Sequence, residues 1–223
     1  MGEISVKTGN NARNGGKNSL NRLIRCVCGK KIGPDPRNFN QRVSLGRNDL
    51  LIRTFPNHLD IGVGTGYYLT KIPAHYNISL MDLNPASLKA ASARVGEDRI
   101  HYKVRHDVFE SYPEELHGKF DSISMYYLIH CLPGTMEDKR IVIKNAKAAL
   151  TKGGILYGAT ILGDKVRHNS FALKLLQIYN KKGIFSNFSD SEEELKKMLS
   201  HYFKNIDVIV KGAVAMFSAH GKK

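Results

Sequence analysis

Three glycines alternate with other residues directly after a short apolar stretch. Gly62, Gly64 and Gly66 follow residues 58–61, and Asp60 lies within the end of that stretch. Glycine permits a tight turn and lets the backbone approach a ligand without a Cβ clash. In a doubly wound sheet, the first turn from strand to helix is where nucleotides bind. The pattern therefore predicts a strand, a nucleotide-binding turn and a helix over residues 66–72, whose free N–H groups would stabilise an anionic group.

The spacing of these glycines argues against a dinucleotide. A dinucleotide turn has the pattern G-x-G-x-x-G, and its last position falls on Tyr67 when counted from Gly62 and on Leu69 when counted from Gly64. The chain instead reads D-x-G-x-G-x-G. A glycine turn without any ligand is the alternative, and the order of strand, acid, glycines and helix makes it the weaker one.

Short apolar runs alternate with amphipathic segments from residue 58 onward. This alternation is typical of an α/β fold with a doubly wound, mostly parallel sheet. The expected strands are residues 58–62, 78–82, 100–106, 120–126, 154–161, 206–211 and 213–218, and the expected helices are residues 66–72, 85–95, 136–150, 170–181 and 191–203. The last two strands meet at Gly212, which predicts an antiparallel pair at the end of the sheet.

Two further acids follow expected strands. Asp82 comes about 20 residues after the glycine turn, the position from which a carboxylate accepts ribose hydroxyls. An acid at this place could instead cap the helix that begins near Pro85. Asp107 follows the third strand and could accept from the exocyclic amine of adenine, or it could be a solvated loop residue.

Aromatic residues and a histidine follow the fourth strand. Tyr126, Tyr127 and His130 are expected over the carboxyl edge of the sheet. His130 is the candidate general base, because a histidine with an ordinary pKa near 6.5 can take a proton from a hydroxyl or an amine. A packing or capping role for this histidine is the alternative.

Together these segments resemble the class I S-adenosylmethionine-dependent methyltransferases, in particular the small-molecule type, over residues 58–218. The resemblance implies a seven-stranded sheet with a reversed last strand and S-adenosyl-L-methionine as the cofactor. It implies that the methionine part lies over residues 62–66, the ribose at Asp82 and the adenine near Leu83, Asp107 and Val108. The methyl group would point toward the residues after the fourth strand. The implied cofactor residues are Asp60, Gly62, Gly64, Gly66, Asp82, Leu83, Asp107, Val108 and Tyr126, and the implied acceptor contacts are Tyr67 and Tyr127.

The N-terminal part has a different composition. Residues 1–57 carry 11 Lys or Arg and three acids, so they hold +8 of the net charge of +14. We expect residues 1–50 to be a basic, poorly ordered extension or an atypical cap, and residues 51–223 to be the methyltransferase domain. Similar enzymes place an amphipathic lid before the first strand, which this segment does not resemble.

Composition and charge restrict the function further. No apolar run reaches the roughly 18 residues of a membrane span, and we expect a cytoplasmic protein. Cys26, Cys28 and Cys131 have no paired zinc spacing, so no metal is expected. The expected function is transfer of a methyl group to O, N or S of a small molecule. An RNA or protein methyltransferase recruited by the basic N-terminus, and a non-catalytic S-adenosylmethionine-binding protein, are the alternatives; nucleic acid is the less favoured partner.

Overall fold

The computed structural model describes residues 56–223, and the expected N-terminal extension, residues 1–50, lies outside this range. The described part contains one seven-stranded sheet with the order β3-β2-β1-β4-β5-β7-β6. Its strands are β1 (Asn57–Ile61), β2 (Asn77–Asp82), β3 (Ile100–Arg105), β4 (Phe120–Tyr126), β5 (Leu150–Ile161), β6 (Phe203–Lys211) and β7 (Val214–Lys222). Strands β1 to β5 are parallel, whereas β7 is antiparallel to both β5 and β6. The prediction of a doubly wound, mostly parallel sheet with a reversed last strand is confirmed.

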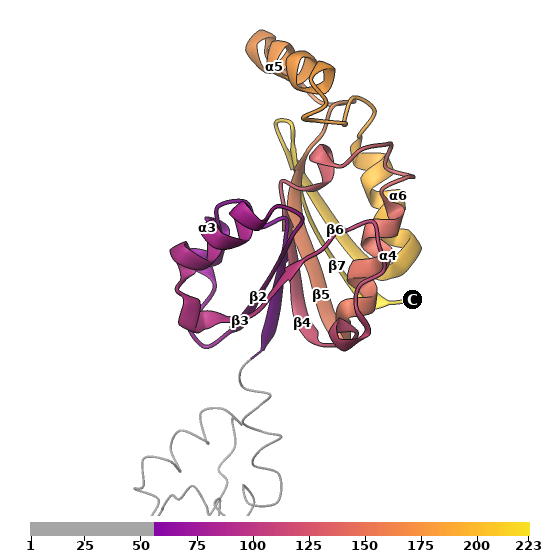
Figure 1. Ribbon diagram of the computed structural model, residues 1–223. Coiled ribbons are helices and arrows are strands. Elements are labelled where there is room, and N and C mark those ends of the chain that lie inside the picture. The colour runs from indigo at the N-terminus through magenta and orange to yellow at the C-terminus, as the bar shows by residue number, and fades with distance from the viewer. Residues whose placement is uncertain (1–55) are drawn as a thin grey trace, which may run out of the picture. The chain divides into compact units, whose positions relative to one another are not determined.

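Helices cover both faces of this sheet (Figure 1). The helices are α3 (Pro85–Val95), α4 (Arg140–Ala149), α5 (Ser170–Lys181) and α6 (Glu192–Tyr202). Helix α3 packs beside β2 and β3, α4 and α6 pack together on the opposite side, and α5 lies beyond the end of β5. Asn84 and Ser191 cap α3 and α6 through their side chains, and both helices begin within one residue of the expected positions. Helix α4 begins at Arg140 rather than at residue 136.

The helix predicted over residues 66–72 is wrong. The structure has only the short 3-10 helix η1 (Tyr68–Lys71) there. Residues 62–76 must form the glycine turn and return across the sheet to β2. A 3-10 helix rises about 2.0 Å per residue against about 1.5 Å in an α-helix, so it spans the same distance with fewer residues. Pro73 also keeps Ile72 extended, which ends the helix at Lys71.

The other 3-10 helices are η2 (Glu97–Arg99), η3 (Glu114–Leu116) and η4 (Ile129–Cys131). The larger apolar core lies between the sheet and the pair α4 and α6, and a smaller one lies under α3. Within residues 56–223, no helix has the length and apolar character needed to cross a membrane. The five parallel strands end at one edge of the sheet, and this edge carries the candidate site.

Candidate active site

The glycine turn after β1 has the left-handed backbone that its sequence predicts. The φ angles of Gly62, Gly64 and Gly66 are +74°, +52° and +73°. A Cβ on Gly62 would lie 2.8 Å from Cδ1 of Leu128, and a Cβ on Gly66 would lie 2.8 Å from Cα of Ala91, so both positions are closed to side chains by packing. A Cβ on Gly64 would meet no atom within 4 Å. Gly64 therefore leaves its backbone open to a ligand.

Asp82 joins the glycine turn to the end of β2. Its Oδ2 accepts from the backbone N–H of Gly64 at 3.4 Å, and its Oδ1 accepts from the N–H of Asn84 at 2.9 Å. The side chain of Asn84, rather than that of Asp82, caps α3 by accepting from the N–H of Ala86. Of the two roles that the sequence leaves open for Asp82, the helix-capping one is thus taken by its neighbour.

A cavity of about 360 Å³ opens beside Asp82 and lies within the size range of small-molecule sites. It brings together the turn after β1 and the segments that follow β2, β3 and β4. Its lining includes five of the residues expected to bind the cofactor: Gly62, Asp82, Leu83, Asp107 and Val108. The sequence prediction missed the other six: His106, Phe109, Leu128, Cys131, Leu132 and Pro133. All six follow the end of β3 or β4, and this position was the signal in the sequence that could have identified them. Most of them are apolar, so their side-chain chemistry did not distinguish them.

Asp107 lies in a local turn at the rim of this cavity. Its Oδ1 accepts from the backbone N–H of Phe109 at 3.0 Å. Val108 beside it is buried, and its carbonyl accepts from the side-chain amide of Asn145 on α4 at 3.0 Å. These two contacts fix the loop that follows β3, so the cavity wall on this side is formed before any ligand binds.

Asp60 is buried behind the glycine turn in a polar network. The hydroxyl of Ser124 donates to Oδ1 of Asp60, and the same hydroxyl lies 3.0 Å from Nε2 of His58. The other ring nitrogen of His58 lies 2.9 Å from the hydroxyl of Ser122. These residues meet because β1 and β4 are neighbouring parallel strands, in whose register His58 pairs with Ser122 and Asp60 with Ser124. The sequence prediction found Asp60 and missed the three partners.

Burial sets the protonation of this network. It raises the pKa of Asp60 to about 7, a shift that the hydrogen bond from Ser124 opposes and the nearby Asp82 carboxylate reinforces. Burial also lowers the pKa of His58 to about 4, so this ring is neutral near pH 7. The network therefore has one group, Asp60, that titrates in the physiological range.

Four tyrosines gather at the same edge of the sheet. The ring of Tyr68 stacks on that of Tyr126 with centroids 4.3 Å apart and on that of Tyr67 at 5.2 Å. Tyr127 lies 6.1 Å from Tyr68 and is partly exposed. Its φ is +59°, a left-handed conformation that a non-glycine residue adopts at a cost and that clusters at functional sites. The structure thus brings Tyr67, Tyr126 and Tyr127 together and adds Tyr68, which the sequence prediction missed.

His130 is buried below Tyr127. Its Nδ1 lies 3.4 Å from the backbone N–H of Ile161, which donates to it, and 3.3 Å from the hydroxyl of Thr160. Burial, and then the charge of Lys139, lowers the pKa of His130 to about 4. Because Nδ1 already accepts a hydrogen bond, the neutral ring carries its proton on Nε2 and offers no free lone pair there. The geometry gives the base hypothesis no support, and that role stays a prediction.

A buried ion pair lies next to His130. Nζ of Lys139 donates to Oδ2 of Asp190 at 2.8 Å and to the carbonyl of Ser186 at 2.7 Å, and both charged side chains are almost fully buried. The N–H of Ser186 in turn donates to the carbonyl of His130 at 2.8 Å. The pair therefore ties the start of α4 to the loop after α5 and fixes the segment that carries His130.

Known proteins resemble this chain in sequence. A family model described as "Methyltransferase domain" matches residues 59–156. The YbcY protein of Escherichia coli K12 is 65% identical over 75% of this chain and 86% of its own length. A physcion biosynthesis cluster O-methyltransferase of Aspergillus chevalieri is 40% identical over 73% of this chain and 74% of its own length. The chain belongs to the class I S-adenosylmethionine-dependent methyltransferases. The methyltransferase also shares its fold with the N-methyltransferase NodS of Bradyrhizobium japonicum, at 16% identity and a TM-score of 0.53 over 82% of this chain and 98% of that one.

The cofactor of this methyltransferase is S-adenosylmethionine, and the residues present fit it. The carboxylate of Asp82 lines the cavity beside Gly64, whose Cβ position is open, and a ribose diol can donate to this carboxylate. The apolar walls around Leu83 and Val108 suit a flat purine ring. In residues 56–223, no group of three or more His, Cys, Asp or Glu side chains is arranged to hold a metal ion.

Proposed function

We propose that residues 51–223 transfer the methyl group of S-adenosylmethionine to an oxygen, nitrogen or sulfur atom of a small molecule, in the cytoplasm. Related proteins named as an N-methyltransferase of Penicillium aethiopicum and a demethylluteothin O-methyltransferase of Streptomyces thioluteus support a small-molecule acceptor; they are 38% and 36% identical to the chain. Residues 1–50 are then a basic extension or an atypical cap of this domain.

The cofactor supplies an electrophilic methyl group, so the protein has to hold and orient its two substrates. The turn at Gly64 would hold the methionine part and Asp82 the ribose. Leu83, Asp107 and Val108 would surround the adenine. Tyr67, Tyr126 and Tyr127 lie where they can shield the reacting atoms from water. Correct orientation of two reactants supplies roughly 7–11 kcal/mol of barrier lowering, which is enough for catalysis without a strong base.

The open position at Gly64, next to the Asp82 carboxylate, carries this proposal. Calorimetric titration with S-adenosylhomocysteine tests it in two matched variants. Gly64→Val places a side chain in the open space, and we expect it to abolish binding. Gly118→Val is the control, because Gly118 also has a positive φ of +65° and no atom within 4 Å of its Cβ, yet lies before β4, away from the cavity.

Both variants introduce a similar backbone strain, so circular dichroism and thermal unfolding should change alike in the two. Unchanged affinity in Gly64→Val, or equal loss in Gly118→Val, would remove the glycine turn from the binding site. A screen of metabolite fractions with methyl-labelled cofactor then separates the enzyme from a non-catalytic binding protein. Labelling of RNA or protein fractions instead would overturn the small-molecule assignment.

A further inference from the structure

The polar network behind the glycine turn forms a directed chain of hydrogen bonds when Asp60 is ionised. The Ser124 hydroxyl then donates its single proton to Oδ1 of Asp60, so its oxygen accepts from Nε2 of His58, at 3.0 Å. The pKa of His58 is about 4, and a neutral ring carries one proton. With that proton on Nε2, Nδ1 accepts from the hydroxyl of Ser122 at 2.9 Å. Each donor in this chain points toward the carboxylate of Asp60.

The second oxygen of Asp60 is left over by this chain. Within residues 56–223, Ser124 is the one hydrogen-bond partner of the carboxyl group, and it uses Oδ1. Asp60 keeps an exposure of 5%, and Oδ2 is not among the fully enclosed polar atoms that lack a partner. Asp60 also lies two residues before Gly62, which lines the cofactor cavity. A ligand group at the glycine turn can therefore reach Oδ2.

Among the described residues, the titratable groups around Asp60 are acidic or neutral. The carboxylate of Asp82 faces it from the end of β2, and the phenols of Tyr126 on β4 and Tyr157 on β5 interact with its charge. His58 on its own strand is neutral near pH 7. A buried carboxylate without a cation is unfavourable, and burial accordingly raises the pKa of Asp60 to about 7. A cationic ligand group would remove this penalty.

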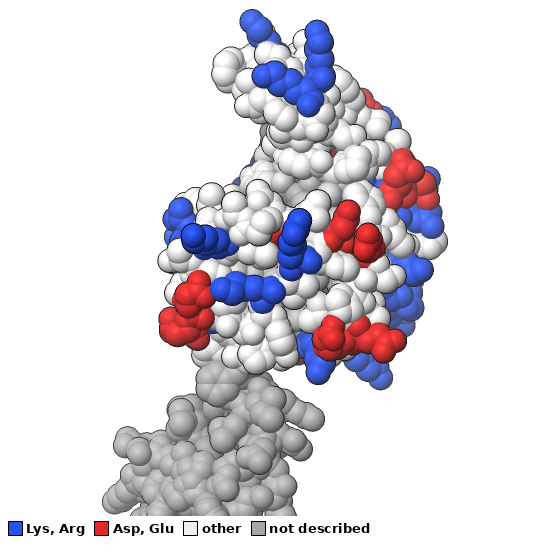
Figure 2. Space-filling model, viewed as in Figure 1, with Lys and Arg blue, Asp and Glu red and all other residues white. Residues whose placement is uncertain are grey.

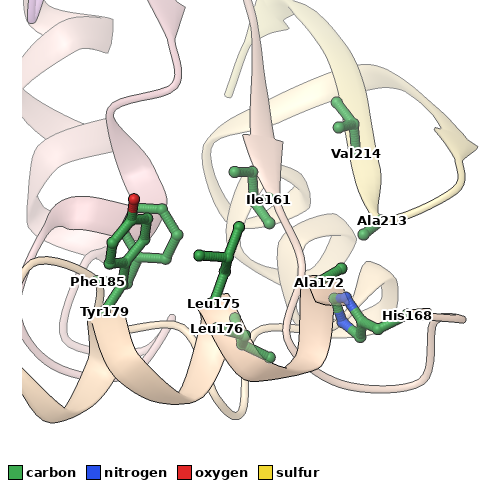
Figure 3. A pocket seen from close by; sticks show the side chains of 9 residues that line it. All are labelled: Ile161, His168, Ala172, Leu175, Leu176, Tyr179, Phe185, Ala213 and Val214. Atoms are coloured by element: carbon green, nitrogen blue, oxygen red, sulfur yellow. The ribbon is translucent and has the colours of Figure 1, made fainter. Parts of the chain in front are cut away.

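The region around α5 lacks the acidic groups that a cation needs. A second cavity, of about 270 Å³, lies between α5 and the adjoining ends of β5 and β7, and its lining includes no Asp or Glu (Figure 3). In the view of Figure 2, α5 carries Lys and Arg side chains, and the surface between it and the body of the domain shows few charges. A cationic group is therefore repelled from α5 and favoured at the glycine turn.

Resting on the proposed methyl transfer, we propose that Asp60 is the counter-ion of the α-ammonium group of the cofactor, and that His58 and Ser124 are positioning residues for its carboxylate. Asp60 releases its proton to solvent when the ammonium group binds, and the two opposite charges then pair. His58 makes no contact with the ligand and acts through Ser124. Cofactor binding is thus linked to pH and becomes stronger as the pH rises through 7.

S-adenosylhomocysteine and 5′-methylthioadenosine are matched probes, because both contain the adenine, the ribose and the sulfur, and the second lacks the amino-acid part. Calorimetry on the full chain measures both affinities from pH 6 to pH 8. Asp60 goes from about one-tenth to about nine-tenths ionised over this range, so S-adenosylhomocysteine affinity should rise about tenfold. The affinity for 5′-methylthioadenosine should stay constant. His106 also lines the cavity, and any proton that it exchanges is common to both ligands and cancels in the ratio.

Proton release gives a second readout that a purely structural role would not change. At pH 7, Asp60 is about half protonated in the free protein. S-adenosylhomocysteine should therefore release about half a proton more than 5′-methylthioadenosine does. The measurement compares the heats of binding in PIPES and in Tris, two buffers with different ionisation enthalpies.

Two buried serines beside β1 give a matched pair of variants. Ser124→Ala removes the hydrogen bond that favours the ionised carboxyl group of Asp60. The midpoint of the pH profile should rise by about one unit or more, and S-adenosylhomocysteine affinity at pH 7 should fall about fivefold or more. Ser79→Ala is the control, because Ser79 is buried on β2, the other neighbour of β1. Both variants should bind 5′-methylthioadenosine like the wild type, which shows that the cavity is intact.

His58 is tested by removing and restoring its N–H donor. His58→Leu leaves Ser124 without this donor, so the pH midpoint should rise and S-adenosylhomocysteine affinity at pH 7 should fall about twofold or more. His58→Gln has a side-chain N–H, and we expect it to recover most of the loss. Equal midpoints in the two variants would overturn the positioning role of His58.

The titrations of the wild-type protein keep the two proposals apart. Failure to bind S-adenosylhomocysteine at any pH would refute the proposed function. With this binding intact, three results would each overturn the counter-ion role of Asp60. These are a ratio of the two affinities that does not change with pH, equal proton release by the two ligands, and equal pH midpoints in Ser124→Ala and Ser79→Ala.

Discussion

The backbone N–H of Gly64 donates to the carboxylate of Asp82 across 3.4 Å, and so joins the turn after β1 to the end of β2. The two residues are 18 positions apart in the sequence and meet because their strands are parallel neighbours in the sheet. The carboxylate also accepts from Asn84, so its position is fixed from two sides. The cofactor cavity opens beside this junction.

Removing the charge of Asp82 should weaken cofactor binding. Asp82→Asn keeps an oxygen that can accept from Asn84 but loses the carboxylate that ribose hydroxyls prefer. We expect S-adenosylhomocysteine affinity to fall by about 1–3 kcal/mol, the cost of leaving a buried hydrogen-bonding group without its partner. Calorimetry measures this change, and Asp207→Asn, an exposed change on β6, is the control. Equal affinity in both variants would show that Asp82 only braces the glycine turn.

The buried carboxyl of Asp60 should make stability depend on pH. Its pKa is raised from 3.8 to about 7, so between these values the folded protein holds a proton that the unfolded chain has released. Its contribution to stability is present below about pH 4 and is lost as the pH rises through 7. Urea unfolding from pH 5 to pH 8 should therefore show Asp60→Asn gaining stability relative to the wild type. A constant difference across this range would contradict the raised pKa.

Breaking the buried ion pair should destabilise the fold strongly. Lys139→Met leaves the carboxylate of Asp190 buried without its cation, which costs about 3–5 kcal/mol. Lys196→Met removes the exposed partner of Glu192 and should cost at most about 1 kcal/mol. Urea unfolding compares the two. The double variant Lys139→Met with Asp190→Leu should recover most of the loss, and failure to recover would mean that lost packing, rather than the unpaired charge, causes it.

His130 should remain neutral throughout the physiological range. Its pKa of about 4 lies below the ordinary 6.5, so it adds stability above pH 6.5 that is lost as the pH falls toward 4. The proton NMR signal of its ring should not shift between about pH 6 and pH 8, and His130→Asn identifies that signal by its loss. A titration near pH 6.5 would instead favour the role of general base.

The sequence predicted the parts of the site that depend on local backbone chemistry. The alternating glycines predicted the left-handed turn, because residues with a Cβ adopt positive φ only at a cost. The helices expected from residues 85 and 191 begin there within one residue, and the side chains of Asn84 and Ser191 cap them. The helix after the glycine turn was mispredicted, since the short return to β2 and Pro73 outweighed its apolar pattern.

The parts that the sequence did not predict depend on contacts between distant residues. Ser124 joins Asp60 only because β4 lies beside β1 in register. Likewise, His130 became a buried ring with an occupied Nδ1 because β5 brings Ile161 against it. Its position in the sequence, just after a strand, was equally compatible with an exposed base.

The sequence by itself predicted the α/β class with its mostly parallel sheet and the glycine turn, because these follow from periodicity and from the allowed backbone angles of single residues. The family was indicated by the resemblance of its motifs. Only the tertiary structure decided which polar groups are buried, which carboxyl titrates near neutral pH and where an apolar cavity lies. Burial and electrostatics arise when segments far apart in the chain pack together, and no local pattern encodes that arrangement.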